Sequence, residues 1–240
     1  MITKIENFID DRQIQDLINL TKELPSHPGE YSGSSNKKKS TVYDDVTFPG
    51  SGSVTESQRR RIHEVLFRKQ STIDKVSDNV TCGEFDNIFS SIAVYNKGDY
   101  YDWHLDRLTT GQGKIIDVSY TIFLNDPEEY DGGALLVEHD YGTTTFKEKA
   151  GTAVFYPSAC LHRVDEIVRG SRKVVLGLIG CTVSSSQDRH LLTQLSNCIN
   201  RIDDYSKSMS NIMINSEEID DINQRLHYVH MQLHKRFMKH

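Results

Sequence analysis

The sequence predicts a mainly β fold, a sandwich or a barrel, with helices before and after it in the chain. From about residue 85, apolar side chains recur at every second position, in runs rich in β-branched and aromatic residues. Glycine-containing segments such as Asn96–Gly98 and Asp131–Gly133 separate the runs, as turns separate strands. Many short strands at close spacing are typical of sandwiches and barrels. The expected strands are residues 88–95, 118–124, 134–137, 143–146, 152–155 and 174–179.

The N-terminal part of the chain is expected to supply supporting helices. Residues 2–9 have the pattern of a short strand, and Asp10 can cap a helix with Gln13 as its reciprocal partner. Apolar residues at helical spacing continue this helix, and Pro25 ends it.

A long loop is expected after this helix. Residues 25–55 are rich in Ser, Gly, Asn and Lys, and only residues 41–48 have the pattern of a short strand. A second helix is predicted over residues 55–76, where apolar residues again recur at helical spacing.

The C-terminal part is predicted to be helical, with a polar break at residues 203–215. Before the break, the apolar stripe consists of Leu191, Leu195, Cys198 and Ile202. After it, the stripe consists of Ile219, Ile222, Leu226, Val229, Leu233 and Phe237. Such helices are expected to pack on the β-domain or on a second copy, as a homodimer. The predicted division is a β-domain at residues 1–184 and a helical extension at residues 185–240.

The composition argues against several classes of protein. With 28 Lys and Arg against 34 Asp and Glu, the formal net charge is −6, which disfavours nucleic acid as a partner because phosphate binding favours a basic surface. No apolar run approaches the roughly 20 residues of a membrane-spanning helix, and the N-terminus does not resemble a secretory signal. The four cysteines form no Cys-x-x-Cys pair, which gives no support to a zinc ribbon. Their even number would allow disulfides, but their wide spacing favours reduced thiols. We therefore expect a cytoplasmic protein with no membrane partner.

The segment YYDWHLDRL, residues 100–108, carries the first candidate site residues. His104 and Asp106 are separated by one residue, and alternate residues of a strand point to the same face. An imidazole nitrogen and a carboxylate oxygen would then converge on one point. His162, which follows the strand expected at residues 152–155, is the candidate for a third ligand.

These three side chains would suit one metal ion. Two histidines and one carboxylate on one face of a metal leave the other positions open, as in the non-haem Fe(II) oxygenases, although Co, Ni or Mn would also fit. A closed structural zinc site would use four protein ligands. A His-x-Asp pair is common by chance, and the chain has 10 histidines, so surface decoration is the alternative interpretation.

Arg172 lies at the start of the apolar strand expected at residues 174–179. If its side chain points inward, the guanidinium needs an anionic partner, and guanidinium binds carboxylates through a two-pronged fork. A dicarboxylate could chelate the metal through a 2-oxo acid end and meet Arg172 at the other end. The alternative is that Arg172 faces water, as expected for Arg169 and Lys173.

The spacing of these residues resembles that of a known enzyme family. The pattern Tyr95-x-x-Gly98-x-x-Tyr101-x-x-His104-x-Asp106 is similar to the metal-binding segment of the prolyl-4-hydroxylase-like Fe(II)/2-oxoglutarate-dependent dioxygenases. The segments FLNDPEEYDGGAL, GTAVFYPSACLHRV and RGSRKV resemble one branch, the PKHD-type hydroxylases, in order and spacing. The resemblance covers residues 90–184 and is poor over residues 25–85, where entrance loops would lie.

The resemblance implies a double-stranded β-helix, a jelly-roll or cupin-like barrel, with its metal site within residues 95–172. The implied Fe(II) ligands and catalytic residues are His104, Asp106 and His162. The resemblance also implies that Arg172 binds the distal carboxylate of 2-oxoglutarate and that Tyr95 donates a hydrogen bond to the same carboxylate.

The implied activity is hydroxylation of an unactivated C–H bond with O2, while 2-oxoglutarate is converted to succinate and CO2. The substrate would be a prolyl residue of a protein or peptide, or a small molecule, and the resemblance also raises ascorbate as a cofactor. Two other classes stay open: a non-catalytic barrel that senses 2-oxoglutarate, iron or oxygen, and a protein-interaction module. A zinc hydrolase is less well supported because no general base accompanies the three candidate ligands.

Overall fold

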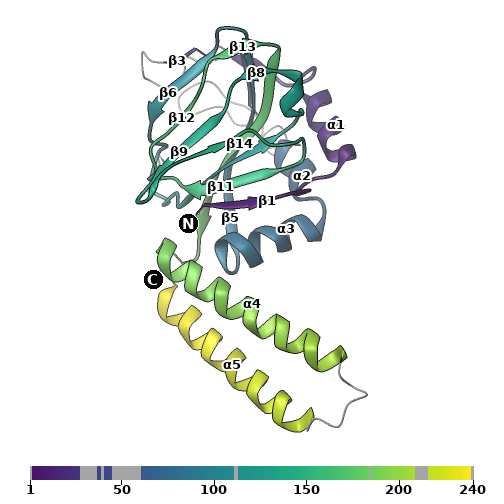
Figure 1. The fold of residues 1–240 in the computed structure, drawn as a ribbon, viewed down its shortest axis with the longest axis vertical. Helices are drawn as coiled ribbons and strands as arrows, with labels where there is room; N and C mark the ends of the chain where they lie inside the picture. The colour runs from purple at the N-terminus through teal and green to yellow at the C-terminus, as the bar shows by residue number, and fades with distance from the viewer. Residues whose placement is uncertain are drawn as a thin grey trace. The chain divides into compact units, whose positions relative to one another are not determined.

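The computed structural model describes residues 2–27, 37–38, 41–44, 61–110, 113–183, 185–208 and 216–238. The chain divides into two compact units. The larger unit comprises Ile2–Ile73 and Asp86–Gly180, and the smaller unit is made up mainly of Asp74–Phe85 and Cys181–His240. The predicted division at residue 184 stays a prediction. The mainly β class with flanking helices is confirmed (Figure 1).

The first sheet of the larger unit has seven strands. Their order is β1 (Thr3–Ile5), β11 (Ala153–Pro157), β7 (Val118–Phe123), β14 (Ser171–Cys181), β5 (Phe85–Asn96), β4 (Thr41–Asp44) and β2 (Ser26–His27). β7 pairs with β11 on one side and β14 on the other, and all its residues are buried, so both of its faces are covered. β4 lies within the short strand predicted at residues 41–48, whose remainder lies outside the described residues.

The second sheet has five strands. Their order is β10 (Gly142–Phe146), β9 (Leu135–His139), β12 (His162–Val164), β6 (Tyr100–His104) and β3 (Lys37–Lys38). A separate two-stranded ladder joins β13 (Ile167–Arg169) to β8 (Asp131–Gly132). Side chains from both large sheets form one buried core, which includes Tyr95, Phe123, Val137, Val154 and Val174. The two sheets therefore enclose a common interior, as the strand spacing predicts.

A sharp turn at Gly132 and Gly133 follows the short strand β8. Both residues have positive φ, 75° and 66°. A Cβ on Gly132 would lie 2.0 Å from the carbonyl oxygen of Glu166, and a Cβ on Gly133 would lie 2.3 Å from Ile167 Cδ1. Both the backbone conformation and the lack of space therefore require glycine, as predicted for the turn before the strand at residue 134.

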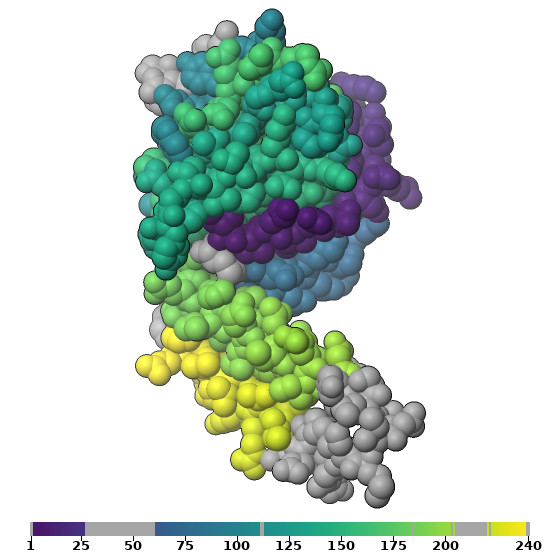
Figure 2. Space-filling view, viewed as in Figure 1, coloured from purple at the N-terminus to yellow at the C-terminus, as the bar shows by residue number. Residues whose placement is uncertain are grey.

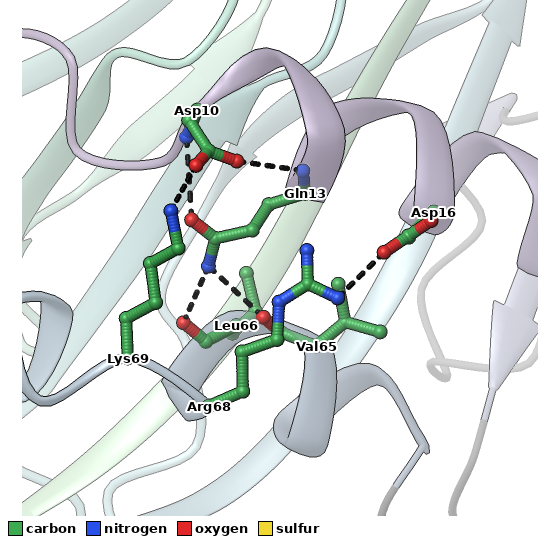
Figure 3. Close-up of polar contacts among 7 residues, drawn as sticks. All are labelled: Asp10, Gln13, Asp16, Val65, Leu66, Arg68 and Lys69. Atoms are coloured by element: carbon green, nitrogen blue, oxygen red, sulfur yellow. Dashed lines mark hydrogen bonds and ion pairs between the residues drawn. The ribbon is translucent and has the colours of Figure 1, made fainter.

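The helices of the N-terminal half are α1 (Asp11–Leu20), α2 (Arg61–Phe67) and α3 (Gln70–Val76). The predicted cap of α1 is confirmed: Gln13 N donates to Asp10 Oδ1 at 2.9 Å, and Asp10 N donates to Gln13 Oε1 at 3.3 Å. The Gln13 side-chain amide also donates to the carbonyls of Val65 and Leu66, at 2.9 and 3.0 Å (Figure 3). A single buried glutamine therefore caps α1 and ties it to α2.

The single helix predicted over residues 55–76 is wrong, because the structure breaks it at Arg68 and Lys69. A continuous helix would use the carbonyls of residues 65 and 66 as acceptors for amides one turn further on. In this structure those carbonyls accept from Gln13 instead. The residues before 61 in this prediction lie outside the described part of the chain.

The smaller unit contains two long helices, α4 (Ser186–Ser208) and α5 (Ser216–Phe237), and the π-helical segment η3 (Ser77–Thr81). α4 and α5 lie side by side, and Figure 2 shows their atoms in direct contact. Their apolar cluster consists of Cys82, Val183 and Leu192 with Leu233 and Phe237. Among the described residues, none of the helices is both long and apolar enough for a membrane crossing.

Two details predicted for this C-terminal region are wrong. α4 continues to Ser208, so no break begins at residue 203. Leu191 is 61% exposed whereas Leu192 is fully buried, so the buried face is displaced by one residue from the predicted stripe. The reason is that α4 has apolar residues on adjoining faces, and its packing against η3 and α5 decides which face is covered. Ile222 and Val229 of the second stripe are likewise exposed.

Replacing Gln13 with Ala should destabilise the larger unit. The variant loses the capping box and leaves two carbonyls without the amide that bonds them, which should lower the free energy of unfolding by about 2–3 kcal/mol. Chemical denaturation followed by circular dichroism measures this change. Gln15→Ala, at an exposed position of the same helix, is the matched control and should cost less than about 0.5 kcal/mol. Equal stability of the two variants would contradict the role given to Gln13.

Candidate metal centre

The pairing of β6 with β12 brings the two candidate histidines together. The strands are antiparallel, and His104 lies directly opposite His162 in their register. β6 ends at His104, so strand alternation does not place Asp106, which comes instead from the segment after the strand. The three side chains nevertheless converge, since one donor atom from each lies within 4.8 Å of the others. No other such cluster of His, Cys, Asp or Glu occurs in the part of the chain that the structure describes.

The donor atoms face one another across a short gap. His162 Nε2 lies 3.5 Å from Asp106 Oδ2, and His104 Nε2 lies 4.0 Å from Asp106 Oδ1. His162 is 4% exposed, whereas the side chain of Asp106 is 26% exposed. The cluster is therefore buried on the His162 side and open to solvent on the Asp106 side.

Backbone carbonyls orient both imidazoles. His104 Nδ1 lies 2.7 Å from the carbonyl oxygen of Asp102, and His162 Nδ1 lies 3.0 Å from that of Cys160. Because a carbonyl only accepts, each Nδ1 carries a proton in these contacts. Both Nε2 atoms face the Asp106 carboxylate, which is the orientation that metal binding requires.

Aromatic rings pack against the histidines. Tyr101 stacks on His104, with ring centroids 3.4 Å apart and ring planes 8° apart. The ring centroid of Tyr156 lies 4.9 Å from that of His162. Burial raises the pKa of Tyr156 well above its usual value, and the nearby charge of Asp106 raises it further. The Tyr156 phenol therefore keeps its proton at neutral pH.

Neighbours of the candidate ligands in the sequence face outward. Trp103 is 38% exposed. The guanidinium carbon of Arg163, on the paired strand β12, lies 5.2 Å from the centroid of the Trp103 ring. Leu105 and Leu108 are also exposed. Within the paired strands β6 and β12, alternation therefore places Trp103 and Arg163 on the face opposite the histidines.

Arg172 is fully buried on β14, so the alternative interpretation that it faces water is wrong. Its guanidinium carbon lies 5.1 Å from the ring centroid of Tyr95 and 5.4 Å from that of Phe123. None of its three guanidinium nitrogens has a hydrogen-bond partner among the described residues. A buried cation is costly unless an anion pairs with it, so this geometry calls for an anionic ligand.

Two tyrosines lie beside this guanidinium. Burial raises the pKa of Tyr95 to about 12, and the charge of Arg172 opposes that rise. Burial likewise raises the pKa of Tyr130, again opposed by Arg172. Both phenols therefore stay protonated and can donate hydrogen bonds. Tyr95 was predicted to lie here, whereas Tyr130 was not, although it stands inside the quoted segment FLNDPEEYDGGAL.

The histidine cluster and Arg172 lie near the same two tyrosines. Tyr156 and Tyr95 belong to one core cluster, and each is close enough to both Asp106 and Arg172 for the two charges to act on its pKa in opposite directions. A ligand with two anionic ends would meet the metal donors at one end and the guanidinium at the other.

Comparison with known proteins agrees with this arrangement. Residues 90–179 match the model of the 2OG-Fe(II) oxygenase superfamily. A PKHD-type hydroxylase from Acaryochloris marina is 44% identical over 101 residues, which are 42% of this chain and 46% of that protein. One from Prochlorococcus marinus is 39% identical over 136 residues, which are 57% of this chain and 50% of that protein. The chain thus spans about half the length of the curated relatives it matches.

Solved structures show the same fold at low sequence identity. A 2OG-Fe(II) oxygenase family oxidoreductase from Burkholderia pseudomallei has a TM-score of 0.58 at 18% identity, covering 75% of this chain and 84% of that one. A prolyl-4-hydroxylase from Pseudomonas putida has a TM-score of 0.54 at 17% identity, covering 75% and 92%. The predicted double-stranded β-helix is therefore confirmed.

Proposed function

We propose that this chain is an Fe(II)- and 2-oxoglutarate-dependent oxygenase that hydroxylates an unactivated C–H bond. The observation that carries the proposal is the buried guanidinium of Arg172. Its neighbour Tyr95 belongs to the same core cluster as Tyr156, whose ring packs against the candidate ligand His162. A dicarboxylate that chelates the metal gives both ends of the pocket a partner.

The donor set fits Fe(II). Two neutral imidazoles and one carboxylate converge from one side, and this ligand type leaves the other side to cosubstrate and O2. When bound, Fe(II) and 2-oxoglutarate supply the oxidising chemistry, in which O2 gives one oxygen atom to the substrate C–H bond and one to succinate, with release of CO2. The backbone bonds to Nδ1 keep both histidines in the form that can hold the metal.

The charges of the pocket fit 2-oxoglutarate. A divalent metal held by one ionised carboxylate and two neutral histidines has one net positive charge, and Arg172 adds a second. A dianion neutralises both. The planar guanidinium can bind the distal carboxylate through two parallel hydrogen bonds, and the surrounding rings of Tyr95 and Phe123 exclude water from that contact.

The proposed substrate is a prolyl residue of a protein or peptide. The PKHD-type hydroxylases in sequence and the Pseudomonas putida prolyl-4-hydroxylase in fold support this choice. A solved prolyl hydroxylase from Trichoplax adhaerens, in complex with a hypoxia inducible factor peptide fragment, shares the fold with a TM-score of 0.52 at 15% identity. A small-molecule substrate is the alternative.

We also propose a location, an oligomeric state and a reductant for this enzyme. All four cysteines are free thiols, which supports a cytoplasmic location. Exposed apolar residues on α4 and α5, such as Leu191, Tyr228 and Met231, support a homodimer through the C-terminal helices. The proposed reductant is ascorbate, and only the family resemblance supports it.

Adding Fe(II) and then 2-oxoglutarate without oxygen should produce a weak visible charge-transfer band at about 500–530 nm, as expected when a 2-oxo acid chelates iron on two histidines and one carboxylate. His162→Ala should abolish the band because it removes one metal ligand. His139→Ala, which changes a histidine of the neighbouring strand β9 outside the cluster, is the matched control and should retain it. Folded wild-type protein that gives no band would contradict the proposed function.

Arg172→Gln should raise the 2-oxoglutarate concentration needed for half-maximal succinate release by about 100-fold, because two charge-assisted hydrogen bonds of roughly 1.5 kcal/mol each are lost. The Fe(II) affinity should change by less than about threefold, since Arg172 is no metal ligand. Arg169→Gln is the control, because Arg169 is an exposed neighbour paired with Asp131 and should leave both values unchanged. An unchanged 2-oxoglutarate requirement in Arg172→Gln would show that the anion binds elsewhere.

A further inference from the structure

Tyr130 is a buried phenol whose place in the fold is not explained by core packing alone. Its side chain is fully buried, and its hydroxyl has no hydrogen-bond partner among the described residues. A buried hydroxyl without a partner is destabilising, and phenylalanine would fill the same volume without that cost. The hydroxyl therefore calls for a ligand atom to accept its hydrogen bond.

Gly133 packs against both Tyr130 and Arg172. A Cβ at this glycine would lie 3.2 Å from Tyr130 Cε2 and 3.2 Å from Arg172 Cδ. The two side chains thus approach the same point of the turn, and the lack of a side chain at Gly133 lets them do so. At ordinary hydrogen-bond distances neither the phenol hydroxyl nor the guanidinium finds a partner among the described residues, and the two groups are close enough for Arg172 to lower the pKa of Tyr130.

The Tyr130 ring is also in contact with Lys147. The Lys147 ammonium donates to the Tyr130 carbonyl oxygen at 2.8 Å and lies 4.6 Å from the ring centroid. Both contacts favour the observed position of the Tyr130 side chain.

We infer that Tyr130 is a further donor, beside Arg172 and Tyr95, for the distal carboxylate of 2-oxoglutarate, and this inference rests on the proposed function. A carboxylate offers about four acceptor sites on its two oxygens. A two-pronged bond from Arg172 uses one site on each oxygen, and the Tyr130 hydroxyl donates to a site that is left. The phenol and the guanidinium together recognise the end of the cosubstrate that is remote from the metal.

The test is a titration of Tyr130→Phe with 2-oxoglutarate under anaerobic conditions in the presence of Fe(II), followed by the charge-transfer band. Loss of one hydrogen bond to a charged group should raise the dissociation constant about tenfold. For 2-oxopentanoate, which has the same chain length but no distal carboxylate, Tyr130→Phe and wild type should bind equally. This second ligand separates a contact with the carboxylate from a general disturbance of the pocket.

Thermal unfolding gives an independent readout that needs no turnover. Without cosubstrate, Tyr130→Phe should be as stable as wild type or slightly more stable, because the lost hydroxyl has no partner in the described structure. With 2-oxoglutarate and Fe(II), the ligand-induced rise in unfolding temperature should be smaller than in wild type. Tyr120→Phe is the matched control: its buried hydroxyl bonds to Ser90 and Asn87, so this variant should lose stability and keep its affinity for 2-oxoglutarate.

The outcomes separate this inference from the proposed function. A band in wild type with an unchanged dissociation constant in Tyr130→Phe overturns the inference and leaves the proposed function standing. Equal weakening of 2-oxoglutarate and 2-oxopentanoate binding also overturns it, as does marked destabilisation of Tyr130→Phe without cosubstrate. Absence of the band in wild type overturns both.

Discussion

The register between β6 and β12 is the constraint on which the candidate site depends. It sets His162 opposite His104, and a shift by one residue would carry one imidazole to the outer face, where Trp103 and Arg163 now meet. On its other edge β12 pairs with β9, so the register is held from both sides. The metal donors therefore depend on backbone pairing between strands that are far apart in the chain, and Asp106 only has to follow β6 by two residues to join them.

The two ends of the pocket are carried by different sheets. The histidines belong to β6 and β12 of the five-stranded sheet, and Arg172 belongs to β14 of the seven-stranded sheet. The buried core between the sheets fixes their separation, and close-packed interiors do not adjust freely to a ligand. The length of the ligand that can span the pocket is thus set by core packing, well away from the metal donors themselves.

Sequence patterns reveal the parts of this fold that local chemistry determines. β7 and β14 are long, apolar and bounded by turns, and both were predictable. β12 is only three residues long, and its strand conformation comes from its ladder partners, so no local pattern predicted it. The candidate ligands were found through their spacing and the family resemblance. Tyr130 was missed because only the turn at residues 132 and 133 brings it to Arg172.

Under the proposed function, charge selects the cosubstrate before shape does. A 2-oxo acid with a single carboxylate would satisfy the metal end and leave the Arg172 guanidinium buried without an anion, at a cost of several kcal/mol. A dicarboxylate too short to reach Arg172 would incur the same cost. The proposed cosubstrate, 2-oxoglutarate, supplies one carboxylate for the metal end and one for Arg172. The unpaired guanidinium therefore makes the site less stable without its ligand, and the same feature makes the site selective once the ligand binds.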